Sequence, residues 1–231
     1  MPRRRLSVVL AAGALAVLAL AGCRVEPGKA AFVGDTAHSK TDVDQVLEQI
    51  AQDGIQIDPA QKGRIQRLIV QDQVFVDVAR RYATEHGYGE PTVHLEATAQ
   101  QLSPLPPGNA FVRLFAQTDA YRELLFSKAK PTNPTDAELR EVYQNLVDAG
   151  ARGSFAEIGP QLRQVPSIGP ALAVRRELTE AVRGYDVKVN PRYGPPSFPL
   201  LELTDQSGKK YPAVVLSYAP GAAKPVVHDL S

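Results

Sequence analysis

Apolar residues recur at helical spacing through most of the middle of the chain, and the first such stretch follows residue 39. Its apolar positions are Val43, Val46, Leu47 and Ile50. Ser39 stands before them as a candidate N-cap, and Asp42 lies three residues later, where a capping box usually has Glu or Gln. The pattern predicts an amphipathic helix that ends before the break at residues 54–59.

A long helix is predicted from Pro59, close to its first position, to about His86. It carries two apolar stripes. The broad face comprises Ile65, Leu68, Ile69, Phe75, Val76, Ala79, Tyr82 and Ala83, and the second stripe comprises Val70, Val74 and Val78. Because a helix that is apolar on two sides is packed on two sides, we expect this helix at the centre of a bundle.

More helices are predicted downstream, between turns rich in proline and glycine. Their expected spans are residues 91–101, 109–129 and 135–150, followed by one or two helices in 154–183 that are interrupted around Pro166 and Pro170. The most specific start is Thr135, which forms a full capping box with Glu138. The chain is therefore predicted to be mostly α-helical.

Short strand-like segments flank the helices. Residues 30–34 and 185–189 are each too short to stand alone, so we expect them to pair with each other and close the bundle. After Gly194 a proline-rich C-terminal extension (residues 195–231) begins. Within it, residues 200–204 and 211–218 read as a hairpin joined by 205–209, and the last residues read as an irregular tail.

The N-terminus indicates export. Three arginines precede an apolar run that is too short to cross a hydrocarbon core of about 30 Å comfortably, which is typical of a signal peptide. The run ends in Leu20-Ala21-Gly22-Cys23, which resembles a bacterial lipobox. The resemblance implies a signal peptide of residues 1–22, diacylglycerol on the Cys23 sulfur, and a tether of residues 23–29. Cys23 is the only cysteine, so it has no intramolecular disulfide partner.

Three segments in this order resemble the SurA/PrsA class of exported chaperones and foldases. They are residues 31–44, 134–143 and 185–194, similar to the family's opening strand and capped helix, the capped helix after its N-terminal bundle, and its closing strand. The resemblance implies a SurA-type N-terminal helical domain over residues 30–194. In the enzymatic members a parvulin prolyl-isomerase domain separates the last two segments. Here only residues 151–184 do, which is too short for such a domain.

The remaining chemistry-bearing residues do not assemble into a recognisable catalytic or metal motif. The histidines are His38, His86, His94 and His228, and none has a close-spaced histidine or cysteine partner. Glu90 and His94 at helical spacing indicate a surface pair more than a ligand set. His38 lies where the family usually has an apolar residue, and we expect it half-buried on Val43, with a pH-sensing role as the alternative. No cofactor is expected, and the chain is interpreted as non-catalytic.

Composition and aromatic spacing bear on the partner. Removing the three arginines before Cys23 leaves 23 basic against 25 acidic residues, which does not favour nucleic acid as a partner. Near-helical spacing favours a core face over a peptide-binding groove for the aromatic residues Phe111, Phe115, Tyr121 and Phe126. Met1 is the only methionine, so a methionine-rich adaptable binding surface is absent from the sequence.

The leading hypothesis is a lipoprotein on the extracytoplasmic face of the cell membrane, with chaperone-like binding of unfolded exported polypeptides. One alternative is a scaffold or assembly lipoprotein that binds a specific cell-envelope protein. Another is an enzyme with an unrecognised site. A large exposed apolar groove would favour the chaperone, and a flat, compact patch would favour the scaffold. A deep cleft with perturbed carboxylates would favour the enzyme.

Overall fold

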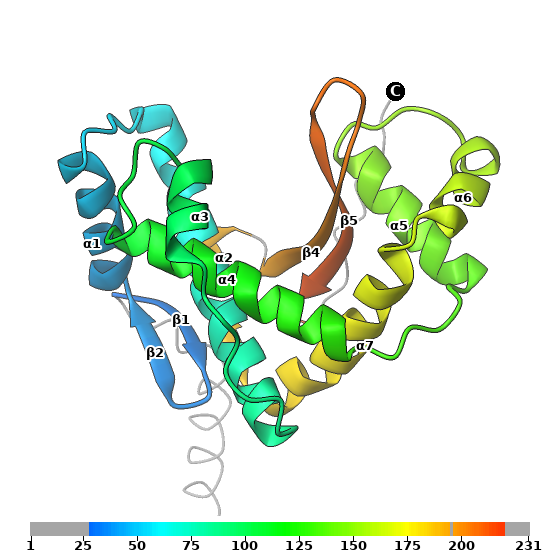
Figure 1. Cartoon of the computed structure of the whole chain (residues 1–231), viewed down its shortest axis with the longest axis horizontal. Coiled ribbons are helices and arrows are strands. Elements are labelled where there is room, and N and C mark those ends of the chain that lie inside the picture. Colours follow the sequence, from blue (N-terminus) through cyan, green and yellow to red (C-terminus); the bar gives the residue numbers. More distant parts are fainter. Residues whose placement is uncertain (1–27, 195, 220–231) are drawn as a thin grey trace, which may run out of the picture.

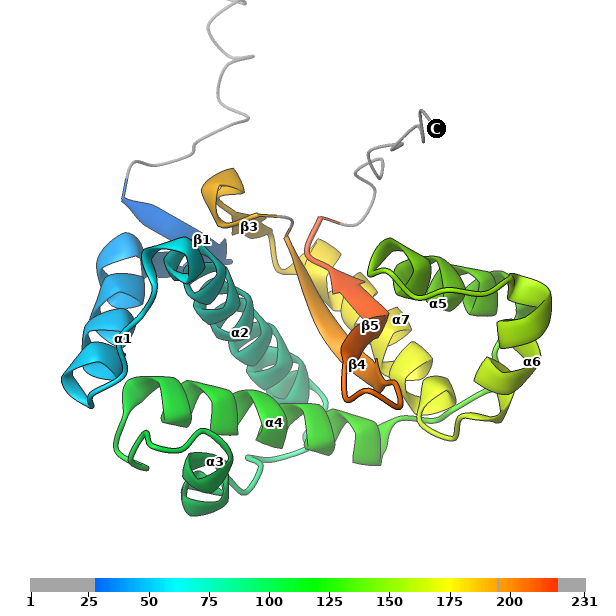
Figure 2. The ribbon, with the colours of Figure 1, turned by 90° about the horizontal axis from the view of Figure 1, so that it is seen from above.

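The computed structural model describes residues 28–194 and 196–219, which form seven α-helices and two small antiparallel sheets. Helices α1 to α4 and the first sheet lie toward one end, and α5 and α6 lie toward the other (Figure 1). The view from above shows helix α7 and the β4–β5 hairpin between these two groups (Figure 2). The expectation of a mostly helical chain is confirmed.

The first sheet joins the two ends of the helical region. Strand β1 (Lys29–Val33) pairs with β3 (Val187–Val189), so the predicted pairing of residues 30–34 with 185–189 is present. Strand β2 (Thr36–Ser39), which the sequence analysis missed, pairs with the other edge of β1 across the two-residue turn Gly34-Asp35. The turn was expected to lead directly into a helix, whereas it leads into an edge strand.

Helix α1 (Lys40–Gln52) begins directly after β2. Ser39 caps it, and the Asp42 carboxylate accepts from the Ser39 backbone N–H at 2.7 Å, which completes the capping box with Asp in the usual place of Glu. Helix α2 (Pro59–Glu85) has Asp58 as N-cap and Pro59 at N1. It packs against α1, α4, α7 and β1, which confirms its central position.

Helix α4 (Ala110–Lys128), with Asn109 as its N-cap, covers one side of α2, and helix α3 (Leu95–Gln101) packs on α4. Helix α5 (Asp136–Asp148) starts with the predicted capping box of Thr135 and Glu138. Helices α6 (Phe155–Gln164) and α7 (Ile168–Gly184) follow. The break between them lies at residues 165–167 only. Pro170 does not interrupt α7, because it occupies the first turn, where backbone N–H groups have no partner within the helix.

Strands β4 (Ser197–Thr204) and β5 (Lys210–Ser217) form the predicted hairpin. Its base is part of the main core, in which the Phe198 ring stacks on Phe75 of α2 with centroids 4.0 Å apart. The Tyr218 hydroxyl donates to the Gln71 carbonyl of α2 at 2.9 Å. Within residues 196–219, the extension expected from the sequence is therefore an integral layer against α2, α5 and α7.

A 3₁₀ turn, η2 (Pro191–Tyr193), leads from β3 toward the hairpin. None of the helices in the described ranges is both long enough and apolar enough to span a bilayer. The expected signal peptide, Cys23 and the end of the C-terminal tail lie outside the described residues.

Candidate functional site

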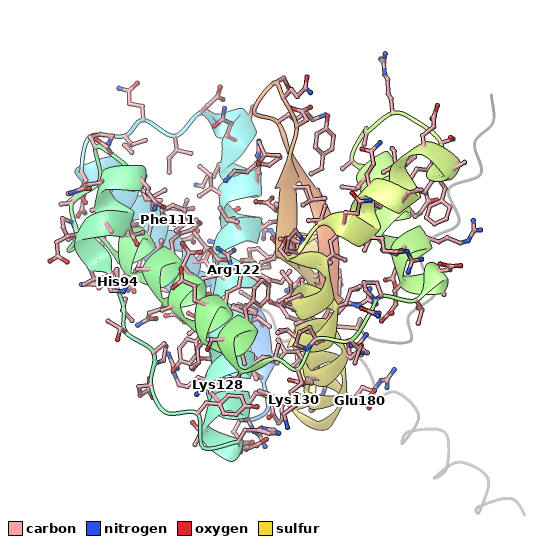
Figure 3. The ribbon with its side chains drawn as sticks, turned by 45° about the vertical axis from the view of Figure 1, so that its right-hand side comes forward. His94, Phe111, Arg122, Lys128, Lys130 and Glu180 are labelled. Carbon is pink, nitrogen blue, oxygen red and sulfur yellow. The ribbon has the colours of Figure 1, made fainter. Side chains whose placement is uncertain are left out.

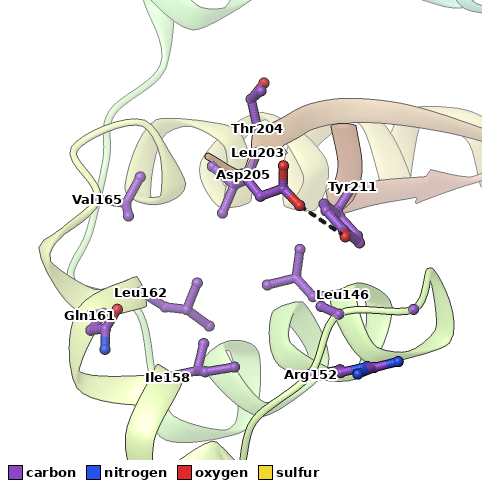
Figure 4. Close-up of a pocket in the computed structure, with 12 residues that line it drawn as sticks. Leu146, Arg152, Ile158, Gln161, Leu162, Val165, Leu203, Thr204, Asp205 and Tyr211 are labelled. Atoms are coloured by element: carbon purple, nitrogen blue, oxygen red, sulfur yellow. Dashed lines mark hydrogen bonds between the residues drawn. The ribbon is translucent and has the colours of Figure 1, made fainter. Parts of the chain in front are cut away.

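An open pocket of about 700 Å³ lies where the outer half of the hairpin meets α5 and α6. Its apolar lining consists of Leu146, Ile158, Leu162, Val165, Leu203 and Tyr211. Leu203 from β4 faces Leu162 and Ile158 across the space (Figure 4). The volume falls in the range of about 300–1,000 Å³ that is usual for ligand-binding pockets.

The helical walls of this pocket are set by local sequence signals. Gly150, at φ +95°, reverses the chain after α5. Ser154 and Glu157 then form a capping box that starts α6, with Glu157 accepting from the Ser154 backbone at 2.8 Å. The Tyr143 hydroxyl donates to the Gly153 carbonyl at 2.9 Å and ties the connecting loop to α5. These bonds place the apolar face of α6 opposite the hairpin.

The hairpin wall is held by Asp205. One carboxylate oxygen accepts from the Ser207 backbone N–H at 2.8 Å, the Ser207 hydroxyl at 2.6 Å and the Lys209 N–H at 3.0 Å. The other accepts from the Tyr211 hydroxyl at 3.1 Å (Figure 4). The Ser207 hydroxyl bond is the largest cause that lowers the pKa of Asp205, so this carboxylate is ionised at neutral pH. The turn therefore has a fixed shape beside the pocket.

A second, more polar pocket of about 420 Å³ lies between α2 and α7. The Tyr82 hydroxyl donates to Glu177 at 3.0 Å, and the Tyr185 hydroxyl donates to Glu85. Burial, together with these carboxylates, raises the pKa of both tyrosines, so both phenols remain protonated donors at neutral pH. The His86 ring stacks on Tyr82 with centroids 3.9 Å apart. These hydrogen bonds link α2 to α7, and they already engage the hydroxyl groups of both tyrosines.

The centre of the molecule contains one strongly perturbed carboxyl group. Asp72 on α2 is 2% exposed, and its Oδ2 has no hydrogen-bond partner among the described residues. Burial, followed by the charge of Asp119 on α4, raises the pKa of Asp72 well above its ordinary value, while Arg122 opposes the shift. Arg122 projects from α4 beside α2 (Figure 3). A carboxyl group this enclosed is not presented to a substrate from solvent.

The three histidines that the structure describes lie apart from the apolar pocket, and His228 lies outside the described residues. His38 is half-buried, as expected, and its Nε2 lies 2.8 Å from a carboxylate oxygen of Asp77 on α2. His94 precedes α3 as its N-cap residue, without a side-chain capping bond. Its expected partner Glu90 accepts from Tyr121 instead. Among the residues that the structure describes, no three His, Cys, Asp or Glu side chains are grouped to hold a metal.

The aromatic side chains of α4 do not form an open groove. Tyr121 is 3% exposed, and Phe111 and Phe126 pack against the core as half-buried residues. Figure 3 places Phe111 near His94, away from the hairpin. The pocket residues were not predicted from the sequence, in which residues 195–231 were expected to contain a hairpin without an assigned role. The signal was present in Leu203 and Tyr211, apolar residues beside a polar turn.

Comparison with known proteins adds no relative. The chain matches no family model, and no curated protein or solved structure matches it either.

Proposed function

We propose that this chain is a membrane-anchored extracytoplasmic lipoprotein that binds apolar segments of unfolded exported polypeptides without catalysing a reaction. The observation that supports this proposal is the apolar pocket between α5, α6 and the hairpin, which is open to solvent and lined by six large apolar side chains. The resemblance of residues 30–194 to the chaperone class supports the same function, and the lipobox-like sequence at Cys23 supports the location.

The binding mechanism requires neither a cofactor nor ATP. A client segment places one or two apolar side chains in the pocket, and each fully buried Leu, Ile or Phe side chain contributes about 1.5–3 kcal/mol. Much of this energy is offset by the ordering of the client and the loss of its free motion. Binding through this site is therefore weak and reversible, as holding a client before release requires.

The alternative is a scaffold that binds one specific envelope protein. One observation favours it: among the described residues, Val93 is the only large apolar side chain classed as exposed, at 36%. A small apolar surface suits one matched partner, whereas a general chaperone needs surface for many sequences. The number of unrelated clients that the chain protects therefore distinguishes the two functions.

The deciding experiment measures light scattering from several unrelated aggregating clients. We expect scattering to fall as the protein approaches an equimolar ratio, because a holdase competes stoichiometrically with self-association. Leu203→Ser removes an apolar contact from the pocket and should weaken the protection. Glu202→Ser, one residue earlier and exposed, is the matched control. If no client is protected at a large excess of protein, the scaffold function replaces the holdase function.

The absence of prolyl-isomerase activity is part of the proposal. Residues 151–184, where enzymatic members of the resembled family carry the parvulin domain, are occupied here by α6 and α7. We expect no acceleration of a proline-limited refolding reaction at catalytic amounts of protein. Acceleration proportional to the amount of protein, lost on mutation of this chain, would contradict this part.

The anchor is tested separately. Cys23→Ala should release the protein from membranes or leave its precursor unprocessed, since diacylglycerol brings two acyl chains and one chain alone holds weakly. Cell fractionation and the size of the mature protein are the measurements. Normal processing with unchanged membrane partitioning would exclude lipidation at Cys23.

A further inference from the structure

Two basic side chains lie at the mouth of the apolar pocket, Arg152 as part of its lining and Lys209 next to the lining residue Tyr211. Arg152 lines it from the α5–α6 loop. Lys209 lies in the hairpin turn, with its Nζ 4.5 Å from the centre of the Tyr211 ring and 3.4 Å from the Ala149 carbonyl. Neither forms an ion pair with a carboxylate among the residues the structure describes. Their charges are therefore open to a ligand.

The one carboxylate at the mouth is already engaged. Both oxygens of Asp205 accept hydrogen bonds from its own turn, so this group is fixed and does not reach outward. Its charge still counts, so the three groups together carry a net charge of +1. The mouth therefore has two cations without a carboxylate partner, whereas its anion is engaged by hydrogen bonds within its own hairpin.

We infer that the pocket selects polypeptide segments in which an apolar side chain is flanked by acidic residues. The apolar side chain occupies the space between Leu203 and α6, and the flanking carboxylates meet Arg152 and Lys209. A segment with basic flanks meets like charges at the same mouth, so its binding is weaker. This inference rests on the proposed function and assigns the class of sequence that the site accepts.

The shape of the site agrees with a side-chain-mediated mode of binding. Addition of a client strand to the hairpin edge is disfavoured, because Pro199 in β4 and Pro212 in β5 lack backbone donors. The Asn145 amide also donates to the Ala213 carbonyl of β5 at 3.1 Å, which occupies an acceptor of that strand. Selectivity then depends on the side chains of the client. The apolar lining and the charged rim of the pocket recognise them.

The experiment uses the full chain in nanodiscs of neutral phosphatidylcholine and measures fluorescence anisotropy of three labelled peptides. The peptides share one Leu-Ile-Leu centre and carry Glu, Gln or Lys flanks. We expect the Glu peptide to bind roughly fivefold more tightly than the Lys peptide at low salt, which is reasonable for two exposed ion pairs. The preference should shrink as salt screens these charges. Empty nanodiscs supply the background.

The variant Arg152→Gln/Lys209→Gln should bind the Glu and Lys peptides with equal affinity, and Arg152→Glu/Lys209→Glu should reverse the preference of the wild type. Because both side chains are exposed, these variants are expected to fold, which far-ultraviolet circular dichroism checks. If the wild-type chain binds all three peptides equally, and Leu203→Ser weakens this binding, the charge selection is overturned and the proposed function stands. Failure of every peptide to bind would overturn both.

Discussion

The two halves of the β4–β5 hairpin have the same secondary structure and opposite surroundings. At its base, Phe198, Leu200 and Leu216 are 0–3% exposed, and they pack into the core that α2 shares with the other helices. At its tip, residues 204–210 are exposed, and Leu203 and Tyr211 face α5 and α6 across an open pocket. One hairpin thus serves as core at one end and as the wall of a binding site at the other.

The difference shows how a stable fold can carry an adjustable surface. The base is fixed by ring stacking on Phe75 and by the Tyr218 bond to α2. The tip is tied to α5 by little more than the long contact from Lys209 to Ala149. Local opening free energies are lowest where buried apolar contacts are few. We therefore expect the tip to move as one piece toward a ligand, with its turn still held by Asp205, while the base remains in place.

The largest effect is expected from a chain that ends after Gly194. It keeps every helix but loses five large buried side chains of the hairpin region: Phe198, Leu200, Val214, Leu216 and Tyr218. At about 1.5–3 kcal/mol for each, the loss amounts to about 7 kcal/mol or more, which is comparable to the whole stability of a typical domain. Thermal unfolding should lose its cooperative transition. A chain that ends after Ala219 is the control, and equal melting of the two chains would show that the base is dispensable.

A smaller but still large effect is expected at the aromatic stack. Phe198→Ala should lower the free energy of unfolding by about 3–5 kcal/mol, because it leaves a cavity against Phe75. Urea denaturation followed by circular dichroism measures it. Phe198→Leu keeps most of the volume and should recover more than half of the loss. A cost below about 1 kcal/mol for the alanine variant would mean that the base is as loosely packed as the tip.

The pH dependence of stability tests Asp72, the buried carboxyl group next to the base of the hairpin. Because its pKa is raised in the folded chain, Asp72 keeps a proton that the unfolded chain releases around the ordinary value of 3.8. Its contribution to stability therefore falls as the pH rises from 3.8 toward the folded pKa. Asp72→Asn cannot ionise, so it should be more stable than the wild type at pH 7, by about 1–3 kcal/mol.

The same comparison at lower pH supplies the control for Asp72. Near pH 3 both proteins carry a neutral side chain at this position, so the difference should vanish. Carboxylates with lowered pKa values, such as Asp42 and Glu138, contribute less to the stability of the protein as the pH falls. This loss is the same in the wild type and in Asp72→Asn. A difference that is the same at pH 3 and pH 7 would show that ionisation of Asp72 is not its cause.

The sequence predicted elements well where the signal was local. The capping boxes at Ser39 and Thr135 and the hairpin strands all follow from residues within a few positions of each other. The two apolar stripes of α2 also predicted its central position, because packing on two sides requires them. The β1–β3 pairing was the one long-range contact anticipated, and it depended on two strands that were too short to be stable alone.

The pocket was not predictable in the same way. It forms because the hairpin folds back onto α5 and α7, and no local pattern specifies which helices a strand pair will cover. Leu203 and Leu146 are far apart in the sequence and meet only in the folded chain. The aromatic residues of α4, by contrast, carried a periodicity that favoured a core position, and Tyr121 is buried accordingly. Periodicity reports burial, whereas a binding site depends on which surfaces are left uncovered.

The smallest effect on stability is expected from Leu203→Ser at the tip, and this gives the sharpest contrast with Phe198→Ala. Leu203 is half-buried beside an open pocket, so its replacement leaves no closed cavity, and the free energy of unfolding should fall by less than about 1 kcal/mol. Binding of apolar peptides should nevertheless weaken, because the lost contact belongs to the site. Urea denaturation and peptide titration on the same preparation separate the two quantities, with Glu202→Ser again as the control. A stability loss as large as that of Phe198→Ala would mean that the tip is part of the core, and the pocket would then be a packing defect with no binding role.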